Sequence, residues 1–201
     1  MRMQLLLLVA VVFLCAFPLF AQRPYDAYMT AMKRGVIEPY VHAFVAKCIG
    51  GTTARPRGFY SRGGWFATDN LPSEMRDNGA DNDATAYVWM VGGKPRAVYQ
   101  WTHDGEFDRD LLACMDESGR VTHSISRYMP GTSEPNQQWI LIHTLEWNPR
   151  TRQYTPHARF TDWQGRPRGK PHMSSEDQDF VAGERVIRKW SDFDFARLAE
   201  K

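Results

Sequence analysis

The stretch around residues 85–163 repeats one pattern, an apolar β-prone run that breaks at a glycine followed by a basic residue. The breaks are Gly93-Lys94, Gly119-Arg120 and Gly165-Arg166. Glycine adopts the positive φ angles of tight turns at little cost, whereas β-branched and aromatic residues favour extended backbone. The pattern therefore predicts strands that turn back on their neighbours, and we expect an antiparallel β-meander.

Turn residues divide the meander into six expected strands. They span 86–91, 96–103, 106–116, 121–129, 139–148 and 153–163. Because side chains alternate between the faces of a strand, the large side chains at odd positions are expected to share one face. These are Tyr87, Trp89, Val91, Tyr99, Trp101, Phe107, Leu111, Met115, Val121, Ile125, Trp139, Leu141, Leu145 and Trp147. Strand 139–148 also has apolar even positions, which predicts a central place, covered on both sides.

Helical spacing of apolar residues predicts an N-terminal helix over 24–49 that packs on the odd face and ends at Gly50-Gly51. Pro39 predicts either a kink or two helices that meet near Glu38. Residues 174–190 fit a helix or a final strand equally. Ser191 and Asp194 have the spacing of a capping box, which predicts a short terminal helix. The expected fold is α+β: a helix on a curved antiparallel sheet of about six strands. Its element order loosely resembles cystatin-like and NTF2-like folds, in arrangement alone.

Residues 1–21 have the features of a cleavable secretory signal. Arg2 precedes an apolar run from Leu5 to Phe20, and polar residues follow Ala21. This predicts export, either secretion or a periplasmic location, with residues 22–201 as a single α+β domain. Leu19 occupies a position where a small residue is preferred, so an uncleaved anchor that tethers the chain to a membrane is the alternative. No other apolar run is long enough to span a membrane.

Charge and cysteine content narrow the classes of partner. The chain has a net charge of +2, so nucleic acid is not an expected partner. Cys48 and Cys114 remain after removal of the signal, and an oxidising compartment favours a disulfide between them. Two free, buried thiols are the alternative. Cys114 has even parity and the helix is expected on the odd face, so a bond would require a bulge near Leu111-Leu112 or a path around the sheet edge.

Three histidines are the candidate metal or catalytic residues. His123, His143 and His157 have odd parity on three successive strands, and imidazoles that converge in this way can bind zinc. A turn near Arg150-Thr151 would place His143 opposite Arg159 and diagonal to His157. Either histidine could then act as a general base. No His-x-His motif supports a shared site, and histidines that make separate hydrogen bonds are the commoner outcome, so no metal or other cofactor is expected.

Two further sets of residues are weaker candidates. Glu146 and Asp162 have equal parity and could form a carboxylate pair for glycoside chemistry. An arginine-aromatic stretch offers charge and stacking surfaces for a glycan through Arg57, Tyr60, Arg62 and Trp65. An ordinary strand with buried aromatic residues is the favoured alternative for this stretch.

The sequence favours an exported, non-enzymatic domain that binds a small ligand or a glycan between helix and sheet. The alternative is a hydrolase-like enzyme whose site on the sheet uses histidine, with or without a metal. Whether the chain is an enzyme stays open at this point.

Overall fold

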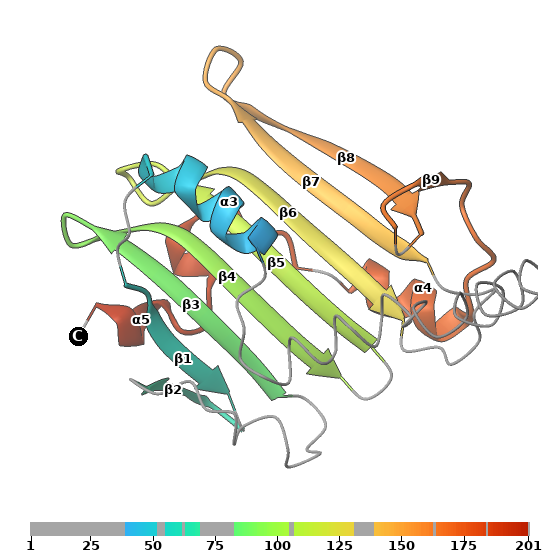
Figure 1. Cartoon of the computed structure of the whole chain (residues 1–201), viewed down its shortest axis with the longest axis horizontal. Coiled ribbons are helices and arrows are strands. Elements are labelled where there is room, and N and C mark those ends of the chain that lie inside the picture. Colours follow the sequence, from blue (N-terminus) through green and yellow to red (C-terminus); the bar gives the residue numbers. More distant parts are fainter. Residues whose placement is uncertain are drawn as a thin grey trace, which may run out of the picture.

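A nine-stranded antiparallel sheet dominates the part of the chain that the structure describes (Figure 1). The structure is a computed structural model, and it describes residues 39–51, 55–61, 63–68, 83–104, 107–130, 139–162, 164–183 and 185–200. The strands lie in the order β2-β1-β3-β4-β5-β6-β7-β8-β9. Their bounds are β1 (Arg57–Ser61), β2 (Trp65–Thr68), β3 (Asp83–Val91), β4 (Lys94–Asp104), β5 (Phe107–Met115), β6 (Val121–Pro130), β7 (Ile140–Asn148), β8 (Gln153–Thr161) and β9 (Pro167–Arg168).

The predicted antiparallel meander is confirmed, and the predicted number of strands is too low. The six expected strands correspond to β3 to β8. The prediction missed β9, which has two residues, and did not count β1 and β2, which pair with each other inside the arginine-aromatic stretch. Strand β7 is not central in the sheet. Its first residues, Ile140 to Ile142, are buried, as their two apolar faces predict, but its second half is half-buried or exposed.

Helix α3 (Pro39–Ile49) lies across one face of the sheet, which we call the helix face (Figure 1). Pro39 is its first residue, where a missing N–H costs nothing, and the helix ends at Gly50-Gly51 as predicted, both with positive φ. The predicted half of the helix before Pro39, and so the kink, lies outside the described residues. The apolar side chains of α3 pack on the aromatic residues of β3 and β4, and the burial of each stabilises the fold by about 1.5–3 kcal/mol. They are Val41, Phe44, Val45 and Ile49.

The C-terminal segment covers the opposite side of the sheet, which we call the C-terminal face. It comprises α4 (Ser175–Ala182), the 3-10 helix η4 (Trp190–Asp192) and α5 (Ala196–Ala199). Phe193 and Phe195 are buried there and pack with Trp190 against Val88, Val98 and Ala113 of the sheet. Strands β3 to β5 are therefore covered on both sides, by elements from opposite ends of the described chain.

The short terminal helix is confirmed, but its predicted cap is wrong. The predicted cap residue, Ser191, lies inside η4. The residue that precedes α5 is Phe195, which makes no side-chain cap. A capping box is present at the start of α4. The Ser174 hydroxyl accepts from the Asp177 N–H at 3.0 Å, and the Asp177 carboxylate accepts from the Ser174 N–H at 3.0 Å.

The prediction that all odd positions share a face is correct for β3, for β4 and for Ile125 of β6, and it is wrong for the odd residues of β5 and β7. Tyr99 lies on the helix face, and its register partner in β5 is Leu112, which has even parity. Only two residues separate the paired Asp104 and Phe107. An even-numbered loop pairs positions of opposite parity, so the face of each odd residue changes across the hairpin. Leu111 and Met115 consequently lie on the C-terminal face.

This change of parity lets the two cysteines meet directly. Cys114 joins Leu112 on the helix face, below α3, and its sulfur lies at disulfide-bonding distance from that of Cys48. The two Cα atoms are 5.2 Å apart, within the normal range for a disulfide. The expected bulge near Leu111-Leu112 is not needed, and the register shift of this strand pair lies instead between Cys114 and Met115.

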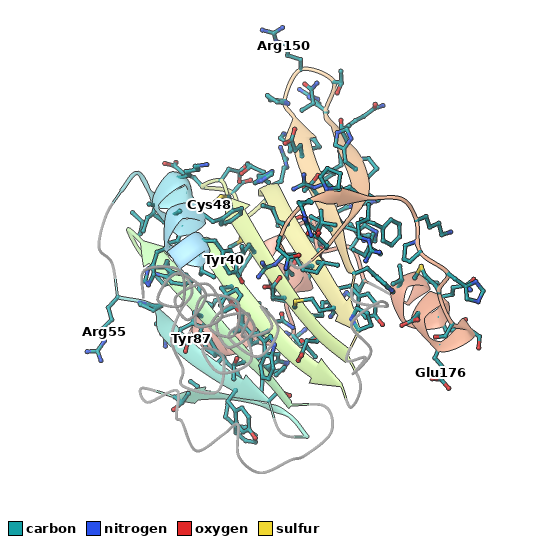
Figure 2. All side chains as sticks on the ribbon, turned by 45° about the vertical axis from the view of Figure 1, so that its right-hand side comes forward. Tyr40, Cys48, Arg55, Tyr87, Arg150 and Glu176 are labelled. Atoms are coloured by element: carbon teal, nitrogen blue, oxygen red, sulfur yellow. A yellow bond between two sulfur atoms is a disulfide. The ribbon has the colours of Figure 1, made fainter. Side chains whose placement is uncertain are left out.

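A buried ion pair fixes the beginning of α3 on the same face. Asp110 is 1% exposed, and both of its oxygens accept from the Arg127 guanidinium group. Tyr40 of α3 donates to Asp110 Oδ2 at 2.7 Å, and its ring lies 4.0 Å below the Arg127 guanidinium carbon. The disulfide and this cluster attach α3 at both of its ends, and Figure 2 labels Tyr40 and Cys48 on the helix.

Among the described residues, no helix has the length and hydropathy that a membrane span requires.

Removal of the disulfide should destabilise the protein without changing the fold. The Cys48→Ser/Cys114→Ser variant is expected to lose roughly 2–5 kcal/mol of unfolding free energy in urea, because its unfolded chain is no longer cross-linked across 66 positions. Dithiothreitol should destabilise the wild-type protein by a similar amount and leave the variant unchanged. Equal urea midpoints for the oxidised and reduced wild-type protein would contradict the bond.

Candidate functional site

A cavity of about 530 Å³ lies between the C-terminal face of the sheet and the C-terminal segment. Its floor is formed by residues of five strands, β4 to β8: Gln100, Arg109, Leu111, Ser124, Ser126, His143, Thr144, Leu145, Pro156, His157 and Ala158. Its roof is formed by Val181, Arg185, Val186, Ile187, Asp192, Phe193 and Asp194. Trp190, Phe193 and Phe195 pack against β3 to β5, and the cavity lies beside them, over β4 to β8.

The floor offers hydrogen-bonding groups from small and medium side chains. Ser124 and Ser126 are 7% and 8% exposed, and both point to the C-terminal face. In the register, Ser126 lies directly opposite His143 of β7, which places their Cβ atoms about 4.5–5.5 Å apart. Gln100 and Arg109 add an amide and a guanidinium group. The floor is thus a polar strip with apolar residues beside it.

The roof is largely apolar, and its carboxylates are already engaged. Asp192 Oδ2 accepts from the N–H groups of Arg188 and Lys189 at 3.0 and 3.1 Å. Asp194 accepts from Arg185 Nη1 at 3.1 Å, and both of these side chains are exposed. These contacts hold the roof in its own conformation. The apolar residues Val181, Val186, Ile187 and Phe193 form the rest of the roof.

The structure separates the three candidate histidines. His143 lies in the cavity floor on the C-terminal face, whereas His123 lies on the helix face, where its ring stacks on Phe44 with 5.6 Å between centroids. His157 belongs to the cavity lining as well, but in the register it pairs with Thr144, so its position lies on the helix face of β8, where it is exposed. The register places Ala158, not Arg159, opposite His143, because the β7–β8 loop has four residues. The expected diagonal contact with His157 is therefore wrong.

The candidate carboxylates are also apart. Glu146 lies on the helix face, and its Oε1 is 3.7 Å from His123 Nδ1. Asp162 follows Thr161, which pairs with Ile140 at the other end of β7, so roughly 20 Å of strand separates the two carboxylates. Asp162 closes a turn instead. Burial would raise its pKa, but hydrogen bonds from the backbone and side chain of Arg166 lower the pKa below its ordinary value.

The residues of the arginine-aromatic stretch do not form one surface, because some pack against the C-terminal segment and another lies on the helix face. Arg57 donates to the Ala199 carbonyl oxygen at the end of α5, and the Trp65 ring packs on Phe195 with 4.7 Å between centroids. Tyr60 pairs with Thr85 and lies on the helix face, and Arg62 lies outside the described residues. Arg57 and Trp65 therefore stabilise the C-terminal segment.

The sequence analysis missed most of the cavity. Ser124 and Ser126 are polar residues at even positions that alternate with Ile125, a pattern typical of a solvent-facing strand side. The signal that could have identified them is the apolar character of the C-terminal segment, since Ile187 and Phe193 need a sheet face to cover. In the described part of the chain, no group of three or more histidine, cysteine or acidic side chains has the arrangement of a metal site.

No protein-family model matches the chain, and comparison with the curated proteins and with the solved structures also returns no match. The site is therefore interpreted from its own geometry.

Helix α4 fixes one end of the roof through a buried tyrosine. Tyr128 of β6 donates to Asp177 Oδ1 at 3.0 Å, while Asp177 Oδ2 completes the helix cap. Tyr128 packs with Trp139, Leu141 and Met173, and Val181 lies against this cluster. Burial raises the pKa of the Tyr128 phenol above its ordinary value of 10.0, and the neighbouring Asp177 carboxylate raises it further.

This raised pKa predicts a loss of stability in alkali. Below pH 10 Tyr128 is protonated in both states, and the hydrogen bond should make the wild-type protein more stable than Tyr128→Phe by roughly 1–3 kcal/mol. Above pH 10 the unfolded tyrosine ionises while the folded one does not, so this advantage should shrink by up to about 1.4 kcal/mol per pH unit. Urea unfolding of both proteins from pH 8 to pH 11 measures this difference in unfolding free energy. A difference that stays constant over this range would contradict the raised pKa of Tyr128.

Proposed function

We propose that the chain is an exported binding protein for a small amphipathic molecule, held in the cavity between the sheet and residues 181–194. The observation that supports this most is that one cavity combines the hydrogen-bonding side chains of its floor with the apolar side chains of its roof. A volume of about 530 Å³ falls within the range of small-molecule sites. Export is supported by the signal-like N-terminus and by the Cys48–Cys114 disulfide, since such bonds persist in oxidising compartments.

The roof favours an amphipathic ligand over a free sugar. Four of its seven residues are apolar, namely Val181, Val186, Ile187 and Phe193. A sugar has hydroxyl groups around most of its surface, and hydroxyls placed against this wall would lose water without gaining a partner. A molecule with one apolar side and one oxygen-bearing side satisfies both walls. Its oxygen atoms would face Ser124, Ser126 and His143.

Binding is favoured over catalysis because the residues beside His143 in the strand register include no carboxylate. Its neighbours on β6 and β8 are Ser126 and Ala158, and those along β7 are Leu141 and Leu145. No carboxylate stands at these positions, whereas a catalytic histidine usually has one behind it. Among the described residues, the carboxylates that line the cavity are those of the roof, which already accept other donors.

A probe that is itself amphipathic tests the cavity. Anilinonaphthalene sulfonate should bind the folded protein saturably, with one site, as measured by its fluorescence. In Ala158→Phe a ring extends from the cavity floor into the cavity. The affinity for the fluorescent probe should then fall at least about tenfold, which is about 1.4 kcal/mol. Thr155→Phe is the matched control, because it adds the same ring to the same strand on the exposed helix face. Equal binding by both variants would contradict the proposal.

One observation supports a second candidate function, acyl transfer. Ser126 and His143 face each other across β6 and β7 in the cavity floor, the relation of a nucleophile to its base. This hypothesis predicts that a fluorophosphonate labels Ser126 and that His143→Ala abolishes the label, as read by mass spectrometry of the digested protein. The binding proposal predicts no label on Ser126 under conditions where the folded protein still binds the fluorescent probe.

A further inference from the structure

A second hollow, of about 300 Å³, lies beside the β5–β6 turn and shares no residue with the lining of the first cavity. We call it the basic pocket. Its lining is Ser118, Arg120, Tyr154, Arg188 and Lys189. Three of these five residues are cationic, and they come from two segments far apart in sequence.

Backbone pairing fixes these two segments side by side. Arg120 and Lys189 form an antiparallel bridge. Beside it the Val121 N–H donates to the Arg188 carbonyl at 2.9 Å, and the Trp190 N–H donates to the Gly119 carbonyl at 2.7 Å. Gly119 has a φ of 78°, and a Cβ atom on it would lie 3.2 Å from Trp190 Cβ. The approach therefore requires glycine at this position.

Carboxylates and a tyrosine hydroxyl make this frame rigid. Asp116 Oδ1 accepts from the N–H groups of Ser118 and Arg120 at 2.9 and 3.0 Å. On the other segment, Asp192 accepts from the N–H groups of Arg188 and Lys189. The Tyr154 hydroxyl lies 2.8 Å from the Arg188 carbonyl and 3.0 Å from that of Val121, and it shares its proton between them.

Aromatic rings hold the two guanidinium groups in place. The Arg120 guanidinium carbon lies 4.4 Å from the centroid of the Trp147 ring, and that of Arg188 lies 5.8 Å from the centroid of the Tyr154 ring. The two rings contact each other, with 4.9 Å between centroids. Cation–π contacts of this kind restrict the arginine side chains while leaving their N–H donors exposed.

The charges of the pocket lack counter-charges at bonding distance. Within the described residues, no carboxylate lies within 4.0 Å of the side-chain cations of Arg120, Arg188 or Lys189. The two nearby carboxylates, Asp116 and Asp192, accept from backbone N–H groups, and Asp116 also accepts from the Ser118 hydroxyl and attracts the Arg120 guanidinium group from a longer distance. Three cations around one hollow repel one another, and an anion placed between them would remove that repulsion.

We propose that the basic pocket binds a phosphate or sulfate group. Guanidinium groups donate paired hydrogen bonds to such oxyanions, and lysine adds a point charge. Donors from three side chains on two segments suit a tetrahedral group, whose oxygens point in several directions, better than a planar carboxylate. The group is either a free inorganic ion or an ester on a larger molecule, and the pocket chemistry is the same for both.

Calorimetric titration of the full-length mature protein at about 50 mM ionic strength tests this. The probes are inorganic phosphate, inorganic sulfate, glucose 6-phosphate and acetate. Phosphate or sulfate should bind saturably at one site, and acetate should bind at least about tenfold more weakly. Tighter binding of glucose 6-phosphate than of phosphate assigns the pocket to an ester, and equal or weaker binding assigns it to the free ion. Absence of saturable binding by all four probes overturns the proposal, as does acetate binding equal to that of phosphate.

Variants matched in charge separate the pocket from the general surface. Arg120→Gln/Arg188→Gln should weaken phosphate binding at least about tenfold, the equivalent of one charged hydrogen bond. The control Arg150→Gln/Arg159→Gln removes the same charge and should change the affinity less than about twofold. Arg150 lies at the tip of the β7–β8 hairpin and points away from the sheet (Figure 2), and Arg159 is on the helix face. Equal losses in the two variants would overturn the proposal.

A third variant keeps the test valid if the double variant unfolds. Lys189→Gln leaves both guanidinium–ring contacts in place and should weaken phosphate binding severalfold, with the melting temperature unchanged. An unchanged phosphate affinity in this folded variant, together with an unfolded double variant, would also overturn the proposal.

Discussion

The number of residues in each hairpin loop decides which side chains of this sheet share a face. Two residues separate β4 from β5 and four separate β7 from β8, and each even loop exchanges the parity of the two faces. The β3–β4 pair keeps its parity because a register shift between Trp89 and Met90 compensates for its two-residue turn. Together, the loop lengths and the register shift place Leu112 and Cys114 under α3 and place Ser126 and His143 opposite the C-terminal segment.

The two covering layers are attached to the sheet by different interactions. Helix α3 is attached by a disulfide and by the buried Asp110–Arg127 pair, whose separation would leave a charge without a counter-ion at a cost of about 3–5 kcal/mol. The C-terminal segment has no covalent link. It depends on aromatic packing, on the backbone pairing at Gly119 and on the Tyr128–Asp177 hydrogen bond. Both the cavity and the basic pocket lie under this second layer or along its edge, and one short run, Val186 to Lys189, contributes to both.

Much of the fold could be predicted from the sequence, because strand positions and turns are local properties. Alternation and turn residues located β3 to β8, and the Gly50-Gly51 stop located the end of α3. The assignment of faces could not be predicted in the same way. It depends on loop lengths and on bulges. A difference of one residue in the register of β7 places His143 on the opposite face of the sheet from the positions of His123 and His157. The candidate site suffered most, since Ser124 and Ser126 have the sequence pattern of an exposed strand face until the segment that covers them is known.

The claim that parity changes between β4 and β5 is tested most directly by methyl nuclear Overhauser effects (NOEs) of two adjacent leucines. The account predicts that the Leu112 methyl groups show NOEs to the Phe44 ring of α3, and that those of Leu111 show NOEs to the Phe193 or Ile187 side chains. The reverse pattern, with Leu111 close to α3 and Leu112 close to the C-terminal segment, would contradict the register and remove the basis for the proposed cavity.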